Sequence, residues 1–170
     1  MLTCSLLSKP DIPYQGLETF VRVARRFPDV PFVHAGPQRD DGALEMLQAL
    51  APSNVQFLGF LSESALVAEM DRALVYAQLS AYAGSGIAVA EAMLVGATPV
   101  VTRVGALPEV VGDVGEYTDY DDVETTAGAI ERALRSPRPA AARDRIVRHF
   151  SLDARRDALL SLVDDVLARA

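Results

Sequence analysis

Short apolar stretches recur along the chain, and longer stretches with helical spacing separate them. The short stretches are apolar throughout, without polar alternation, which is typical of strands covered on both faces of a sheet. Several of them end at glycine, a residue that often marks the end of an element. The predicted strands are residues 1–7, 32–35, 55–58, 73–77 and 99–102, with a short sixth strand at 115–117.

Between these strands, apolar residues recur at every third or fourth position, which predicts amphipathic helices. Ser62, Ser151 and either Asp121 or Asp122 are predicted to cap helices, because their side-chain oxygens can accept from free amides. Residues 8–14 contain two prolines and are predicted to be a loop. The predicted helices are residues 16–27, 43–50, 62–70, 84–95, 122–134 and 151–170.

Strand and helix thus alternate about five times along the chain. The expected fold class is α/β: a Rossmann-like parallel sheet of five to six strands with helices on both faces. A length of 170 residues suits one domain, and half of the residues are apolar, which is enough for a sizeable core. Because the sequence starts on a core strand, residues 1–170 suit a domain cut from a larger protein, or a stand-alone copy of one.

The composition argues against several other classes of protein. The net charge of −7 disfavours binding to duplex nucleic acid, which needs a basic surface. Cys4 is the single cysteine, so no intrachain disulfide forms, and its apolar neighbours predict a buried structural thiol. Two histidines and one cysteine offer no metal-ligand spacing. No apolar run reaches the roughly 20 residues of a membrane span, and residues 1–7 lack the features of a signal peptide, so we expect a cytoplasmic protein.

Ligands of open parallel sheets bind beyond the carboxyl ends of the strands, which directs attention to the loops there. Gly84, Ser85 and Gly86 lie in such a loop and precede a predicted helix. Free amides and the helix dipole at this position attract phosphate, and glycine allows a close approach. The alternative is a tight turn from strand to helix without a ligand.

Glu91 is the one carboxylate in a helix whose other residues, up to Val95, are apolar all round. This pattern predicts burial on most sides, and a buried carboxylate needs a partner. The partner is either an arginine or backbone amides of the protein, or a pair of ligand hydroxyl groups. The sequence leaves these alternatives open.

A second glycine-rich loop follows the fifth predicted strand and ends at Pro108 and Glu109. It is either a second ligand loop, or Glu109 caps the segment Val110–Val111 that follows it. His34 ends a predicted strand, where we expect a packed or a surface histidine rather than one that faces a site. His149 is expected at the surface.

The stretch 80–111 resembles the C-terminal half of retaining glycosyltransferases with two Rossmann domains, the GT-B architecture, in the large group 1 family. That family carries Ser-x-x-Glu-Gly-x-Gly-x-x-x-x-Glu-Ala-Met-x-x-Gly-x-Pro-Val-Val and, later, Gly-x-x-Pro-Glu-Val-Val. The likeness covers nearly the whole chain, including a Val-x-Phe-Leu-Gly segment at 55–59 and the first-loop glycine. One additional residue separates Gly96 from Pro99 in this chain. The matching positions are Gly16, Ser80, Gly84, Gly86, Glu91, Ala92, Met93, Gly96, Pro99, Val100, Val101, Gly105, Pro108, Glu109, Val110 and Val111.

The resemblance implies that the chain binds the nucleoside diphosphate of an activated sugar. It implies that Glu91 binds the ribose hydroxyls and that the amides of Gly84, Ser85 and Gly86 bind the diphosphate. It implies neither a metal nor a cofactor, because the nucleotide sugar is the donor substrate. The remaining implied contacts are Gly59, Phe60 and Leu61 for the base, and Gly105, Ala106 and Leu107 near the diphosphate and sugar.

Three positions depart from the family's pattern. Ala83 replaces a glutamate that contacts the donor sugar, Gln15 replaces a lysine, and Leu6 replaces an arginine. The two lost cations normally neutralise the diphosphate, a contribution on the order of 3 kcal/mol for each lost group. Lys9 and Arg103 are candidate charge stabilisers in their place, since both lie on loops at the expected edge of the sheet.

The resemblance therefore predicts the donor-binding domain of a retaining glycosyltransferase, acting in carbohydrate biosynthesis. The acceptor site would come from an N-terminal Rossmann domain or a partner chain, so this chain alone is expected to bind and not to turn over. A catalytically degenerate binding or regulatory module is the alternative, and half of a nucleotide-sugar epimerase is a weaker one, because Ala83 leaves no carboxylate pair. The apolar side of the helix 151–170 would either seal the domain or form a docking surface.

Overall fold

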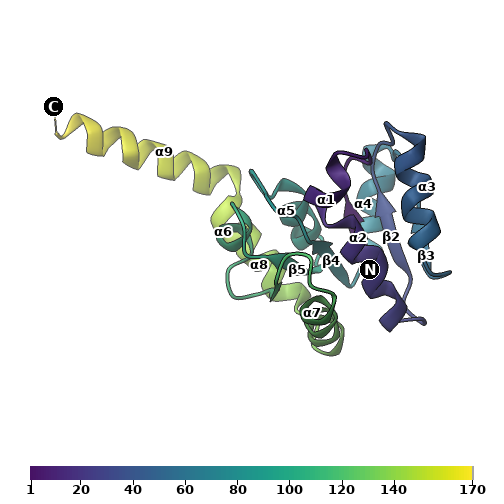
Figure 1. The fold of residues 1–170 in the computed structure, drawn as a ribbon. Coiled ribbons are helices and arrows are strands. Elements are labelled where there is room, and N and C mark those ends of the chain that lie inside the picture. Colours follow the sequence, from purple (N-terminus) through teal and green to yellow (C-terminus); the bar gives the residue numbers. More distant parts are fainter. Residues whose placement is uncertain (170) are drawn as a thin grey trace.

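The computed structural model describes residues 1–169 and contains the expected parallel sheet with helices on both faces (Figure 1). All neighbouring strands pair in parallel. The strand order is β3-β2-β1-β4-β5-β6. The strands are β1 (Leu2–Cys4), β2 (Phe32–Ala35), β3 (Val55–Phe57), β4 (Val75–Gln78), β5 (Thr98–Thr102) and β6 (Glu116–Thr118).

The strand order reverses between β1 and β4, which lie side by side in the middle of the sheet. From β1 the chain builds outward through β2 and β3, and it then returns to add β4, β5 and β6 on the other side. The loops that leave β1 and β4 consequently diverge at their carboxyl ends. Such a reversal opens a crevice where ligands of this fold class bind.

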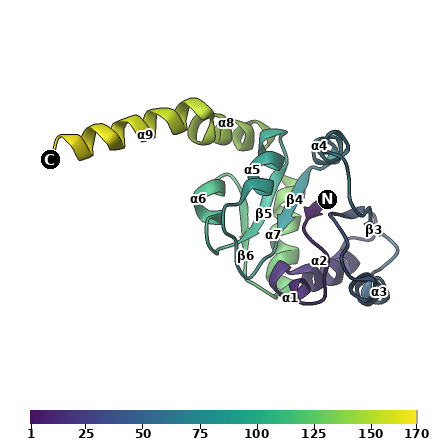
Figure 2. The ribbon, with the colours of Figure 1, turned by 90° about the horizontal axis from the view of Figure 1, so that it is seen from above.

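Helices cover both faces of the sheet (Figure 2). One hydrophobic cluster lies between the sheet and the helices on each face. Ile12, Phe20, Leu47 and Ile130 come from α1, α2, α3 and α7 and pack over one face. The second cluster is formed with α4, α5, α6 and α8. The helices are α1 (Asp11–Gln15), α2 (Leu17–Val23), α3 (Asp41–Leu50), α4 (Glu63–Arg72), α5 (Ile87–Leu94), α6 (Leu107–Val111), α7 (Val123–Arg135), α8 (Pro139–Phe150) and α9 (Leu152–Leu167).

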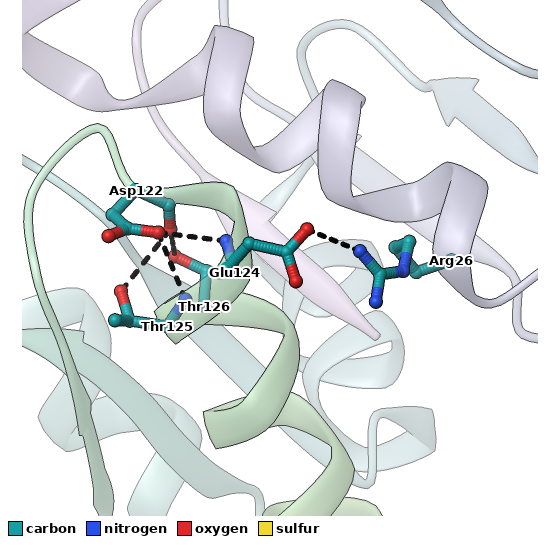
Figure 3. A network of polar contacts seen from close by, with 5 residues as sticks. All are labelled: Arg26, Asp122, Glu124, Thr125 and Thr126. Atoms are coloured by element: carbon teal, nitrogen blue, oxygen red, sulfur yellow. Dashed lines mark hydrogen bonds and ion pairs between the residues drawn. The ribbon is translucent and has the colours of Figure 1, made fainter.

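Asp122 is the residue that caps α7, and it does so with both its side chain and its carbonyl (Figure 3). Its carboxylate accepts from the amides of Glu124 at 2.8 Å and Thr125 at 3.0 Å. Its carbonyl accepts from the Thr126 hydroxyl at 2.6 Å. Glu124 then pairs with Arg26, which follows α2, so the start of α7 is tied to the neighbouring helix. The predicted caps Ser62 and Ser151 are confirmed at α4 and α9.

The helices α1, α6 and α8 lie where the sequence pattern predicted none, and Glu109 lies within α6 rather than before a segment that it caps. Residues 8–14 are not simply a loop, because α1 begins at Asp11 and holds Pro13 in its first turn, where a missing amide costs no helical hydrogen bond. Gly16 then ends α1 in the left-handed conformation, at φ 67°, and α2 begins directly after it. Pro139 does not merely interrupt a helix. It occupies the first turn of α8, a position where proline is preorganised.

The last helix, α9, extends away from the rest of the molecule in both views (Figure 1 and Figure 2). It contacts α8, and none of its residues from Leu152 to Leu167 is buried. The predicted end of this helix at residue 170 lies outside the described residues. Within residues 1–169, no helix combines the length and apolarity that crossing a bilayer requires.

Candidate functional site

The turn after β4 leads into α5 through Gly86, whose φ of 66° lies in the left-handed region. Within the described chain, no side chain caps the start of α5, so the amides of its first turn have no side-chain acceptor. Gly84 and Ser85 are exposed, and a Cβ at Gly84 would meet no atom within 4 Å. An anion can therefore reach the positive end of this helix.

The loop after β5 lies directly against this turn. The amide of Ala106 donates to the carbonyl of Ala83 at 3.1 Å. Gly105 has φ 51°, and a Cβ there would lie 1.9 Å from the same carbonyl oxygen, so only glycine fits. The structure thus brings the two predicted ligand loops together. Ala106 is half-buried at their junction, and Leu107 is buried beneath it.

Glu91 lies on the exposed side of α5, and the prediction that it is buried was wrong. Only the side of α5 that carries Val89, Ala92 and Met93 packs into the core. Ile87 and Leu94, one turn to either side of Glu91, are 62% and 41% exposed. Among residues 1–169 the Glu91 carboxylate has neither an ion pair nor a hydrogen bond, so neither predicted protein partner is present.

A small apolar cavity of about 280 Å³ opens where β1 and β2 end, and we call it the strand-end cavity. Phe60 stands at its rim and is 78% exposed. Gly59, with φ 67°, accepts from the amide of Gly36 at 2.8 Å and so fixes the Phe60 loop to the end of β2. The lining residues are Cys4, Ser5, Leu6, Ala35, Gly36, Pro37, Phe60, Leu61 and Leu66.

Glu91 acts electrostatically on this cavity through Cys4. Burial raises the pKa of the Cys4 thiol to about 11, the Tyr76 hydroxyl opposes that shift, and the charge of Glu91 adds to it. The thiol is therefore protonated near neutral pH and is a poor nucleophile. Cys4, for which the sequence predicted a buried structural thiol, is half-buried.

A second cavity, of about 510 Å³, lies between α5 and the helices α6, α8 and α9. We call it the helix cavity. Its acidic and basic residues are Glu91, Glu109, His149 and Arg155, and the rest of its lining is mainly apolar. Glu91 therefore lines the helix cavity and also acts on a residue of the strand-end cavity.

The two candidate charge stabilisers, Lys9 and Arg103, contact residues outside the turn before α5. Lys9 precedes α1, and its side chain reaches the start of α3, where Nζ lies 3.9 Å from a carboxylate oxygen of Asp40. The Arg103 guanidinium lies over the Tyr117 ring, 3.9 Å from its centroid, and lines an open groove beside α7. Neither residue lines the strand-end cavity or the helix cavity.

The replaced family positions are also visible in the structure. Ala83 is buried, Gln15 is half-buried at the end of α1, and Leu6 lines the strand-end cavity. His34 is packed in the core, with Nε2 3.2 Å from the Ser5 hydroxyl and its ring 5.8 Å from that of Phe57. Burial lowers the pKa of His34 to about 4, so it is neutral and structural.

The fold is that of one half of a GT-B glycosyltransferase. Residues 8–149 match the sequence model of the family described as "Glycosyl transferases group 1". The chain belongs to the glycosyl transferases group 1 family. A curated relative, O-antigen chain mannosyltransferase B of Escherichia coli, is 33% identical over 81 residues, which are 48% of this chain and 21% of the relative.

Solved structures show the same fold. Sucrose-phosphate synthase from Thermosynechococcus elongatus matches with a TM-score of 0.79 and 24% identity over 99% of this chain and 46% of its own. A glycosyltransferase from Rickettsia africae reaches a TM-score of 0.83 at 16% identity, over 99% of this chain and 48% of that one. The Anabaena protein HepE, solved in complex with UDP and glucose, reaches a TM-score of 0.81 at 20% identity, over 96% of this chain and 48% of its own. The chain thus spans about half the length of these structures.

Proposed function

We propose that this chain binds the nucleoside diphosphate of an activated sugar and forms the donor half of a retaining glycosyltransferase. The observation that carries this proposal is the Glu91 carboxylate. It has no partner within residues 1–169, and it follows the uncapped, glycine-lined start of α5. Glu91 lies five positions after Gly86, which is about 7.5 Å along the helix axis. A nucleotide that lies along α5 can therefore place its diphosphate at the turn and its ribose at Glu91.

In this proposal each part of the donor meets matching chemistry. The diphosphate accepts from the free amides after Gly86, where the helix dipole favours negative charge. The ribose hydroxyls donate to Glu91, because a carboxylate accepts from two donors at once. The base enters the strand-end cavity and stacks on Phe60, whose ring is exposed at the rim. The loop Gly105, Ala106 and Leu107 lies next to the turn and limits the space for the sugar.

The chemical role of the chain would be to hold the leaving group. Negative charge develops on the diphosphate as the sugar–oxygen bond breaks, and the start of α5 stabilises it without a metal ion. The acceptor would come from an N-terminal Rossmann half, on the same or on another chain. The solved relatives are about twice as long as this chain, which supports such a half.

The helix α9 offers a surface for that half. It extends from the body, and its apolar residues recur with helical spacing and are exposed. Contact with a second Rossmann half would bury this surface, and each large side chain would contribute about 1.5–3 kcal/mol. The exposed apolar residues are Leu152, Leu159, Leu160, Leu162, Val163, Val166 and Leu167.

A catalytically degenerate binding or regulatory module is the second candidate, and specific positions favour it. Ala83 offers no side-chain acceptor to a sugar, and Leu6 presents an apolar side chain where the family has a cation. Lys9 and Arg103 lie against Asp40 and Tyr117 instead of at the turn. Such a module would keep nucleotide binding and lack transfer.

Calorimetric titration with UDP, GDP and ADP tests the binding proposal. We expect one of them to bind and the Glu91→Gln variant to bind it roughly tenfold more weakly, because a charged hydrogen-bond acceptor is lost. Glu45→Gln is the matched control, since Glu45 is also an exposed glutamate but lies on α3. No binding by the wild type, or equal affinity of the Glu91 variant, would overturn the proposal. Transfer assays with a supplied N-terminal half, with the product anomer read by NMR, then separate a retaining enzyme from a degenerate module.

A further inference from the structure

We infer that Arg145 is a positioning residue for the diphosphate site, acting through α6 on the turn at Gly86. This inference rests on the proposed function, because the site that it shapes is the proposed diphosphate site. Arg145 lies on α8, and it contacts neither the turn nor the start of α5 through any hydrogen bond within residues 1–169. Its effect must therefore pass through α6.

The first step of the argument is that α6 forms the back wall of the turn. A Cβ at Gly86 would lie 3.1 Å from a methyl carbon of Val110 and 3.5 Å from one of Leu107. Both residues belong to α6 and are buried. The preceding loop is joined to the turn by the bond from Ala106 to Ala83. A displacement of α6 would therefore leave the turn without its support.

The second step is that α6 cannot hold its own position. It has five residues, and isolated helices of that length are unstable. The carbonyls at the end of so short a helix have no amide partners further along it. One of them, the carbonyl of Pro108, accepts from the amide of Gly112 at 2.9 Å. The next two need a donor from elsewhere.

Arg145 supplies that donor. Its Nε donates to the carbonyl of Val110 at 2.7 Å, and a terminal nitrogen donates to the carbonyl of Glu109. The guanidinium also lies on Gly112, where a Cβ would be 2.4 Å from Cζ. A positive charge at the end of a helix is further favoured by the dipole. Within the described residues Arg145 has no carboxylate partner, so these carbonyls are its hydrogen-bond acceptors.

This arrangement predicts that replacing Arg145 weakens diphosphate binding and leaves the strand-end cavity unchanged. Arg145→Lys keeps the charge but replaces the planar two-donor fork with a point charge, which cannot reproduce both bonds at once. The α6 wall would loosen and the amides after Gly86 would lose their fixed direction. The strand-end cavity, formed by β1, β2 and the Phe60 loop, shares no residue with α6 and would be unchanged.

The experiment compares Arg145→Lys and Arg145→Ala with Arg148→Lys and Arg148→Ala. Arg148 lies on the same helix and pairs at the surface with Asp144, which makes it a matched control. Calorimetry measures the affinity for the nucleoside diphosphate that binds the wild type and for its parent nucleoside. We expect the Arg145 variants to lose roughly tenfold in diphosphate affinity, with nucleoside affinity and the Arg148 variants unchanged.

Amide hydrogen exchange of the ligand-free variants supplies a readout that does not depend on the proposed function. We expect faster exchange in residues 84–90 as well as in 107–112 when Arg145 is replaced by lysine. Faster exchange in 107–112 alone, or an equal loss of diphosphate and nucleoside affinity, would overturn the inference. Absence of nucleotide binding by the wild type would instead refute the proposed function, and exchange would still decide whether Arg145 acts on the turn.

Discussion

Replacing Gly86 by alanine probes the backbone conformation at the turn on which the candidate site depends. Gly86 has φ 66°, a conformation that costs an alanine about 1–2 kcal/mol. The new Cβ would also lie 3.1 Å from a methyl carbon of Val110, and crowding of that kind adds roughly 1 kcal/mol. The expected destabilisation is therefore about 2–3 kcal/mol. For a chain of this length it lowers Tm by roughly 5–10 °C.

Gly84→Ala is the matched control, two residues earlier in the same turn. Gly84 lies outside the left-handed region, and its Cβ would meet no protein atom within 4 Å. We expect its stability to be unchanged or raised by up to about 1 kcal/mol, because alanine restricts the unfolded chain. The Cβ would, however, stand where a diphosphate approaches, so nucleotide affinity should fall. Urea and thermal unfolding of both variants, with calorimetry, test this separation. Equal stabilities of the two variants would refute the reasoning about the turn.

Two further predictions concern His34 and Phe60. The pKa of His34 is lowered from 6.5 to about 4 in the folded chain, so the unfolded state binds more protons between these values. Stability should fall by up to about 3 kcal/mol as pH drops from 6.5 to 4, and His34→Gln should flatten that part of the pH profile measured by urea unfolding. An unaltered slope in the variant would contradict this assignment. Phe60→Ala should leave Tm unchanged, because the ring is exposed, and should weaken nucleoside binding by about 1–3 kcal/mol; unchanged affinity would exclude stacking on this ring.

The elements that could be predicted from the sequence are those whose signals are local. Each strand of the sheet overlaps its predicted stretch. For the central strands β4 and β5 this follows from burial on both faces, whereas the edge strands β3 and β6 carry Gln56 and Glu116 and are not fully buried. The caps at Ser62, Asp122 and Ser151 were also predictable, since a side-chain oxygen and the amides that it accepts from lie within three residues. By contrast, α1 and α8 were missed because their prolines resemble loop signals, whereas proline in a first turn is tolerated.

In the candidate site, too, some features could be predicted from the sequence and others could not. The glycine turn and Glu91 could be identified as candidates from residue types and spacing, and the Phe60 loop from the family resemblance. The surroundings of Glu91 could not be predicted, because the sequence of an apolar helix does not show whether one side or all sides of it are covered. The role of Arg145 had no signal in the sequence either. Its acceptors lie more than thirty residues earlier, on a helix that was itself not predicted.

The sequence by itself determined the alternation of strands and helices and the glycines that α5 needs at its start. These features follow from backbone conformation and short-range hydrogen bonds, which neighbouring residues control. Only the tertiary structure decided that Glu91 is exposed, that Lys9 and Arg103 face other partners, and that Arg145 holds α6. These outcomes depend on which surfaces the packed helices cover, and contacts between distant parts of the chain determine that.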